Sequence, residues 1–184
     1  KGLSSYEVEE APYFFGRNYH LNQVFHKKLR LHISVQDHNF LAIIADSGCG
    51  KSSFAKAGIL AALKNHRFKE SGNWKQILIK PGKDPLEALS SALFITGFIS
   101  DSREFEEKAK SFKDHLKRTI RDQDETIILF IDQFEEVLTQ CKDDSKRTAF
   151  LSNLVEAHDF EKAIIILTLR SDFYTGFGKH EAFK

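Results

Sequence analysis

A short segment of the chain has the residue types that bind the phosphates of a nucleotide. It runs from Ala45 to Ser52 and reads Ala-Asp-Ser-Gly-Cys-Gly-Lys-Ser. The phosphate-loop pattern is Gly, four residues, then Gly-Lys-Ser/Thr, so Ala45 stands where the first Gly is expected. In such a loop, backbone N–H groups bind phosphate oxygens, Lys51 reaches the β- and γ-phosphates, and the Ser52 hydroxyl holds Mg²⁺. The pattern therefore predicts a site for ATP and Mg²⁺.

The segments on either side of the loop support this interpretation. The apolar run 40–45 predicts a strand buried on both faces, and the apolar positions between 55 and 63 predict a helix. A strand that enters the loop and a helix that leaves it are what phosphate binding requires. The alternative is an ordinary strand–turn–helix connection with a chance Lys-Ser. The loop residues that we expect to bind the cofactor are Ser47, Gly48, Cys49, Gly50, Lys51, Ser52 and Ser53.

A carboxylate at the end of a neighbouring strand is the second part of such a site, because it helps to place Mg²⁺. The apolar run 127–131 is followed directly by Asp132, which predicts a buried strand that ends at the metal. The alternative is that Asp132 only caps the next helix. Together with the loop, Ser52 and Asp132 are the predicted metal ligands.

Hydrolysis also needs a group that orients water, and several side chains are candidates. In many P-loop ATPases a Glu directly follows the Asp, but Gln133 holds that position here. Glu135 and Glu136 are the candidate catalytic carboxylates instead, and the two remain equivalent at this stage. If both only cap the next helix and favour its dipole, ATP hydrolysis is expected to be slow.

A further candidate follows the apolar run 163–169. If this strand lies between the other two, Arg170 at its end faces the phosphates and stabilises the charge of the γ-phosphate. The alternative for Arg170 is an ion pair at the surface.

Four short apolar runs alternate with helical patterns along the chain, which predicts an α/β fold. The runs span 40–45, 77–79, 127–131 and 163–169. We expect a three-layer sandwich with a central parallel sheet covered by helices on both faces. The run 77–79 lies between the strand before the loop and the strand that ends at Asp132, which favours a P-loop NTPase of the inserted-strand (ASCE) type. The main helical patterns span 18–33, 55–63, 86–94, 105–120 and 150–155.

Composition limits the remaining function classes. The 184 residues suffice for one α/β domain, and the net charge of +1 gives no strong field for nucleic acid or an acidic membrane. The 2 cysteines lie far apart and form neither a disulfide framework nor a zinc pattern, so we expect a cytoplasmic protein. No apolar run has the length of a membrane helix. Methionine is absent, so we expect the chain to be part of a longer protein.

Taken together, these motifs resemble the novel STAND NTPases, a bacterial group of the STAND signalling ATPases, which are related to the AAA+ class. The resemblance covers roughly residues 13–175, and the motifs appear in the family's order. The matching segments are 13–17, 45–53 with Ala57 and Gly58, Trp74, 81–86, 131–136 and 167–174.

The resemblance implies further nucleotide contacts and a division of the chain. Phe15, Gly16 and Arg17 would lie near adenine and ribose, and Asn18 stands where the family usually has Glu. Residues 1–17 would form an N-terminal segment. Residues 18–184 would form the P-loop nucleotide-binding domain, incomplete because the helical lid of such proteins is missing.

The resemblance also implies a role as a switch. ATP binding would drive self-association and activate an effector in signalling, cell death or antiphage defence, and ATP hydrolysis would be slow. The partners would be nucleotide, further copies of the chain, and effector and sensor regions of the full-length protein. Two alternatives stay open: a nucleic-acid-associated, AAA+-like motor, against which the near-neutral charge counts, and a non-catalytic scaffold that nucleotide stabilises, which Gln133 keeps possible.

Overall fold

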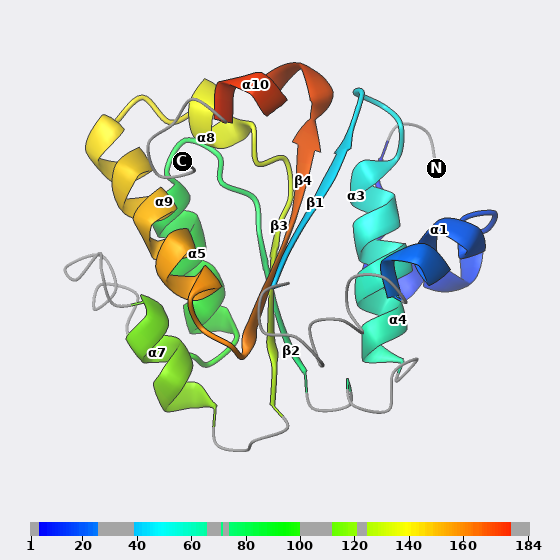
Figure 1. Ribbon diagram of the computed structural model, residues 1–184, viewed down its shortest axis with the longest axis horizontal. Helices are drawn as coiled ribbons and strands as arrows, with labels where there is room; N and C mark the ends of the chain where they lie inside the picture. Colours follow the sequence, from blue (N-terminus) through cyan, green and yellow to red (C-terminus); the bar gives the residue numbers. More distant parts are fainter. Residues whose placement is uncertain are drawn as a thin grey trace.

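The computed structural model describes residues 4–25, 39–65, 71, 74–99, 112–120 and 125–177, without the side chains of 176 and 177. At its centre is a four-stranded parallel sheet with the strand order β1-β4-β3-β2 (Figure 1). The strands are β1 (Phe40–Ala45), β2 (Lys75–Ile79), β3 (Ile127–Ile131) and β4 (Ala163–Arg170). The four predicted strands are confirmed: β1 and β3 have the predicted bounds, β2 begins two residues earlier, and β4 ends one residue later.

Helices cover both faces of this sheet, so the predicted three-layer α/β sandwich is confirmed (Figure 1). One face carries α5 (Pro85–Ile95), α7 (Phe112–Thr119) and α9 (Asp144–His158). The other face carries α1 (Asn18–Val24) and one continuous helix built from α3 (Lys51–Ser53), the π-helical η3 (Phe54–Leu60) and α4 (Ala61–Lys64). Short helical segments complete the described chain: η1 (Val8–Tyr13), α8 (Glu136–Thr139), η5 (Ser171–Phe173) and α10 (Tyr174–Phe177).

Two predicted helices extend beyond what the structure describes. The helix α1 begins at Asn18, with Arg17 as its N-terminal cap residue. The rest of its predicted course, 26–33, lies outside the described residues, as does the part 105–111 of the helix that contains α7. No helix in the described ranges is long and apolar enough to cross a membrane.

The inner strands β3 and β4 form the buried centre of the fold. All residues of β3 are buried, and in β4 burial extends from Ala163 to Leu169. Helices on both faces and a strand on either side explain this burial, as the continuous apolar runs predict. Each fully buried Leu, Ile or Phe contributes about 1.5–3 kcal/mol to the hydrophobic driving force.

Strand β1 corrects one expectation. Its predicted burial on both faces is wrong, because Phe40 and Ile44 are exposed and the residues between them are half-buried. Among the described strands β1 pairs with β4 alone, so it lies at the edge of the sheet, where side chains have fewer neighbours.

The strand order decides which strand ends lie next to one another. In space β2 lies at the other edge, and β4 lies between β1 and β3. The register aligns Ala45 at the end of β1 with Arg170 at the end of β4, and Ile131 of β3 with Leu167. The segments that follow these strands therefore leave the same edge of the sheet, where parallel sheets place their ligand sites.

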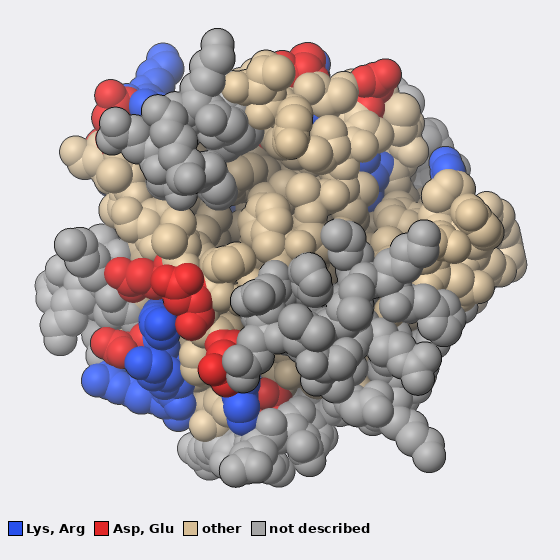
Figure 2. All heavy atoms as spheres, viewed as in Figure 1, with Lys and Arg blue, Asp and Glu red and all other residues tan. Residues whose placement is uncertain are grey.

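Figure 2 shows how the charged side chains of the described residues are distributed on one face of the molecule. There, the basic and acidic side chains of the described residues lie near one another rather than in large areas of one sign. This agrees with the net charge of +1.

Candidate functional site

A cavity of about 500 Å³ lies where β1, β4 and β3 end. Its volume falls within the range of small-molecule sites, roughly 300–1,000 Å³. The loop and the following helix contribute Ser47, Gly48, Gly50, Lys51, Ser52 and Ser53. The ends of β3 and β4 contribute Asp132, Gln133, Glu135, Thr168 and Arg170, and the N-terminal segment contributes Ser4, Ser5 and Tyr6. Most of the predicted site residues thus share one cavity.

The backbone of the loop requires both of its glycines. Gly48 and Gly50 have φ angles of 78° and 80°, in the left-handed region that side chains disfavour. Gly50 also starts the helix, since its carbonyl accepts the first helical hydrogen bond from the Phe54 N–H at 2.8 Å. Cys49, an exposed free thiol, donates its N–H to the Asp46 carbonyl at 3.4 Å and does not line the cavity.

The ammonium group of Lys51 lies against the loop itself. It donates to the carbonyl oxygens of Ala45 and Asp46 at 2.8 Å and 2.7 Å. The Asp46 carboxylate in turn accepts a hydrogen bond from the hydroxyl of Ser171, which follows β4. The loop is therefore fixed from inside by Lys51 and from the neighbouring strand by Ser171.

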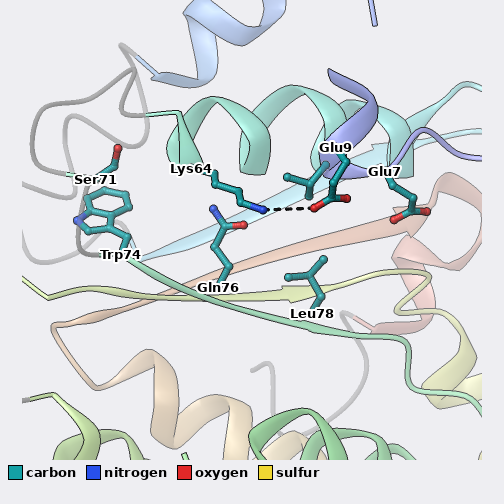
Figure 3. Close-up of a pocket in the computed structure, with 8 residues that line it drawn as sticks. Glu7, Glu9, Lys64, Ser71, Trp74, Gln76 and Leu78 are labelled. Atoms are coloured by element: carbon teal, nitrogen blue, oxygen red, sulfur yellow. Dashed lines mark hydrogen bonds and ion pairs between the residues drawn. The ribbon is translucent and has the colours of Figure 1, made fainter. Parts of the chain in front are cut away.

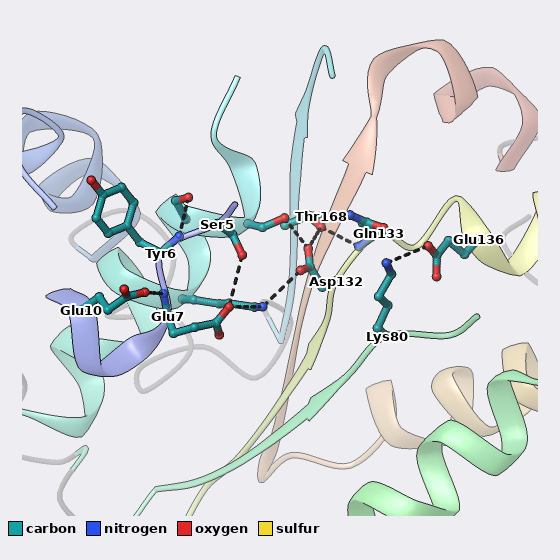
Figure 4. A network of polar contacts seen from close by, with 12 residues as sticks. Ser5, Tyr6, Glu7, Glu10, Lys80, Asp132, Gln133, Glu136 and Thr168 are labelled. Carbon is teal, nitrogen blue, oxygen red and sulfur yellow. Dashed lines mark hydrogen bonds and ion pairs between the residues drawn. The ribbon is translucent and has the colours of Figure 1, made fainter. Parts of the chain in front are cut away.

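Ser52 and Asp132, 80 positions apart in the sequence, are in direct contact. The Ser52 hydroxyl donates to Asp132 Oδ1 at 2.6 Å. The hydroxyl of Thr168 donates to the same oxygen at 2.7 Å and accepts the Gln133 N–H at 2.8 Å (Figure 4). Asp132 is buried and Thr168 fully so. The contact brings together the two predicted metal ligands.

No sequence motif had indicated the role of Thr168. Its hydroxyl orients the Asp132 carboxylate and holds the turn after β3 through Gln133. The signal that could have revealed it is a hydroxyl residue two positions before Arg170, within an otherwise apolar strand. Recognising it required the β3–β4 register, which aligns Ile131 with Leu167 and so brings the following residues level.

The oxygen atoms at this point suit Mg²⁺. Among the described residues there is no group of three or more His, Cys, Asp or Glu side chains that could hold a metal ion. Mg²⁺ differs from structural metals in this respect, because it binds through one or two protein oxygens together with phosphates and water. A hydroxyl and a carboxylate 2.6 Å apart beside a phosphate loop meet that requirement.

The structure separates the two candidate carboxylates. After Gln133, whose φ of 55° turns the chain, Glu135 points to the cavity and Glu136 away from it. Glu135 accepts the N–H of Arg170 at 3.3 Å. Glu136 accepts the N–H of Gly82 at 3.0 Å and pairs with Lys80 at 3.1 Å (Figure 4).

Neither carboxylate caps the helix that follows. Both are buried, and Glu135 occupies the N-cap position of α8 without a capping hydrogen bond from its side chain. The interpretation that both acids only cap this helix is therefore not supported, because Glu135 contacts the end of β4 and Glu136 contacts the turn after β2.

Arg170 lines the cavity with its guanidinium group bound to a neighbour. It forms an ion pair with Asp172 and lies over the ring of Phe173, 5.3 Å from the ring centre. The hydrogen bonds to Arg170 and its positive charge lower the pKa of Asp172. The same hydrogen bonds and the negative charge of Asp172 raise the pKa of Arg170. The surface ion pair considered for Arg170 is thus present at the mouth of the cavity.

The segment expected near adenine lies apart from this cavity. Phe15 is 80% exposed, Gly16 and Arg17 are exposed, and none of the three lines the cavity. Their role as nucleotide contacts stays a prediction. In their place the preceding residues Ser4 to Tyr6 form a wall of the cavity, which no sequence motif had indicated.

A second cavity, of about 410 Å³, lies between the N-terminal segment, α4 and β2 (Figure 3). It is lined by Glu7, Val8, Glu9, Lys64, Ser71, Trp74, Gln76 and Leu78. Here Lys64 pairs with Glu9 at 3.3 Å, and the Gln76 amide donates to the Leu60 carbonyl at 2.9 Å. It contains none of the predicted site residues.

The family model described as Novel STAND NTPase 1 matches residues 1–184, the whole chain. No curated protein matches it.

Proposed function

The chain belongs to the novel STAND NTPase family, and from this premise we propose that it binds ATP with Mg²⁺ in the cavity beside the phosphate loop. The observation that carries the proposal is the 2.6 Å contact between Ser52 and Asp132, next to Lys51. It joins the loop to the end of β3, as a site for a metal-bound nucleotide requires.

The residues of the cavity would have separate roles in binding the phosphates and Mg²⁺. Lys51 turns from the carbonyls of Ala45 and Asp46 towards the β- and γ-phosphates. Ser52 and Asp132 hold Mg²⁺, with Thr168 fixing the carboxylate. When bound, Mg²⁺ supplies positive charge that neutralises the phosphate oxygens.

For hydrolysis we propose Glu135, rather than Glu136, as the residue that orients and deprotonates water. Its support is position, since Glu135 lines the cavity while Glu136 is held by Gly82 and Lys80. Arg170 would stabilise the charge of the γ-phosphate once it is released from Asp172. Asp172 competes with the γ-phosphate for Arg170, and Gln133 stands where many P-loop ATPases have a catalytic Glu. Both features favour slow turnover.

Slow turnover suits a switch better than a motor. STAND NTPases typically bind nucleotide and self-associate. We propose that this chain does so on ATP binding and so activates an effector region in conflict, defence or regulatory signalling. The net charge of +1 counts against a nucleic-acid motor.

The proposal is tested by titrating wild-type protein and Lys51→Ala with ATP in the presence of Mg²⁺. Because hydrogen bonds to charged groups contribute about 1.5–3 kcal/mol, we expect the affinity to fall about tenfold or more. Lys142→Ala, which removes an exposed lysine outside the cavity, is the matched control and should bind as the wild type does. Equal affinity of Lys51→Ala and wild type would contradict the proposal.

A further inference from the structure

The N-terminal segment is fixed to the helix that follows the phosphate loop. The Tyr6 N–H donates to the hydroxyl of Ser53 at 3.0 Å, directly after the proposed metal ligand Ser52. The next residue, Glu7, accepts a hydrogen bond from Ser5 at 3.2 Å and donates its N–H to Glu10 at 2.8 Å. These contacts hold the Glu7 carboxylate beside the helix.

Lys56 connects this segment to the metal site. Its ammonium nitrogen lies 3.1 Å from Glu7 Oε1 and 3.5 Å from Asp132 Oδ2. Its side chain is only 17% exposed. The Asp132 carboxylate is therefore shared: Oδ1 accepts hydrogen bonds from Ser52 and Thr168, whereas Oδ2 faces Lys56.

We propose that Lys56 is a positioning residue that exchanges a contact shared between Glu7 and Asp132 for a contact with Glu7 alone when the metal site is filled. Without a divalent cation, its ammonium group pairs with both carboxylates. When a cation binds at Ser52 and Asp132, Lys56 pairs with Glu7 alone, and the N-terminal segment is held more tightly. The proposal rests on the proposed function, because it takes Asp132 as a metal ligand.

The physical reason is repulsion between like charges at short range. A divalent cation on Asp132 and an ammonium group 3.5 Å from the same carboxylate repel each other strongly in a mostly buried site. Leaving a buried ammonium group without a partner would be costly. Glu7, already 3.1 Å from Lys56, accepts the charge without a large movement. By linkage, a tighter N-terminal segment and tighter cation binding then favour each other.

Two substitutions should change metal affinity in opposite directions. Lys56→Met removes the competing charge and keeps the apolar stem, so cation binding should strengthen. Glu7→Gln removes the acceptor of Lys56, so displacing Lys56 costs more and cation binding should weaken. We expect changes of about three- to tenfold, the upper end exceeding that of exposed pairs because Lys56 is mostly buried. A merely structural role would weaken binding in both variants.

The second pair between the same segment and the same helix supplies a matched control. Lys64 pairs with Glu9 at 3.3 Å, and neither residue lines the first cavity. Lys64→Met and Glu9→Gln should therefore leave metal affinity unchanged.

The experiment measures Mn²⁺ binding by electron paramagnetic resonance, with ADP present, in the whole protein. Asp132→Asn separates the two proposals: if Mn²⁺ binding does not depend on Asp132, the proposed function and the partner exchange both fail. If it does, unchanged affinity in Lys56→Met and Glu7→Gln, or weaker binding in both, overturns the exchange alone.

A double substitution distinguishes the exchange from a direct electrostatic effect of the Glu7 charge on the cation. If Glu7 acts through Lys56, Glu7→Gln should have little effect on Mn²⁺ affinity in the Lys56→Met background; two additive effects would overturn the exchange. Hydrogen exchange of the Tyr6 amide gives a readout beyond affinity. Mn²⁺ with ADP should slow this exchange several-fold in wild type and not in Lys56→Met, whereas equal slowing in both would also overturn it.

Discussion

The Arg170 guanidinium group and the Asp172 carboxylate hold each other through two parallel hydrogen bonds. Nε donates to Oδ1 at 3.1 Å, and Nη2 donates to Oδ2 at 2.7 Å. This fork is the geometry in which Arg also binds phosphate. The group that we propose for the γ-phosphate is thus already bound to a carboxylate, so a phosphate must compete with Asp172 for it.

Asp172→Asn should increase the preference of the protein for ATP over ADP. The amide keeps the shape but not the charge, so it releases Arg170 more readily to a third phosphate. We expect ATP affinity to rise about two- to fivefold, the range of an exposed ion pair, with ADP affinity nearly unchanged. Competition titrations with both nucleotides measure the ratio. In the Arg170→Ala background the substitution should have no effect, and a gain that persists there would contradict the mechanism.

The effect of the Arg170–Asp172 pair on nucleotide preference should not depend on pH near neutrality. The hydrogen bond from Arg170 and its charge lower the pKa of Asp172 in the folded protein, so the pair is fully present above the ordinary pKa of Asp and is lost only as the pH falls through the lowered value. The ATP-to-ADP affinity ratio is measured for the wild type and for Asp172→Asn. The wild-type ratio divided by the variant ratio should stay constant between about pH 6 and 8. A tenfold change of that relative ratio within this range would show that another group controls Arg170.

The sequence predicted the main elements of the site because its local patterns are strong. Apolar runs identify buried strands, and a phosphate loop restricts what can precede and follow it. Ser52 and Asp132 could be paired in advance for this reason, and the structure brings them within 2.6 Å of each other. Periodicity failed at β1, whose burial depends on its place in the sheet rather than on its own residues.

Contacts between distant segments could not be predicted in the same way. Whether Glu135 or Glu136 faces the cavity depends on the turn at Gln133. Its φ of 55° could not be predicted from the residue type. The position of Lys56 between Glu7 and Asp132 depends on where the N-terminal segment crosses the helix. Such features are properties of tertiary packing.

Glu135→Gln should lower ATP turnover about a hundredfold or more while leaving ATP affinity nearly unchanged. The loss of a general base typically costs that much, and the amide keeps the size of the side chain. Single-turnover hydrolysis and equilibrium binding measure the two quantities separately.

Glu136→Gln is the matched substitution at the neighbouring acid. It should leave the rate of hydrolysis within a factor of about two and lower the free energy of unfolding by about 1 kcal/mol, because Gln still accepts the Gly82 N–H but loses the ion pair with Lys80. If instead Glu136→Gln abolishes turnover and Glu135→Gln does not, the assignment of the two acids is reversed.

Thr168→Val should weaken metal binding although it replaces none of the proposed metal ligands. The hydroxyl of Thr168 is buried and bridges Asp132 Oδ1 and the Gln133 N–H, and valine keeps its volume but makes neither bond. The lost bonds should lower the free energy of unfolding by about 1–3 kcal/mol. Because Asp132 loses an orienting partner, Mn²⁺ affinity in the presence of ADP should fall about tenfold, in the range of residues that support metal ligands. Thr168→Ser retains the hydroxyl and should preserve Mn²⁺ affinity even if the lost methyl group reduces stability. Equal Mn²⁺ affinity in Thr168→Val and Thr168→Ser would mean that Asp132 is oriented by Ser52 and Lys56 alone.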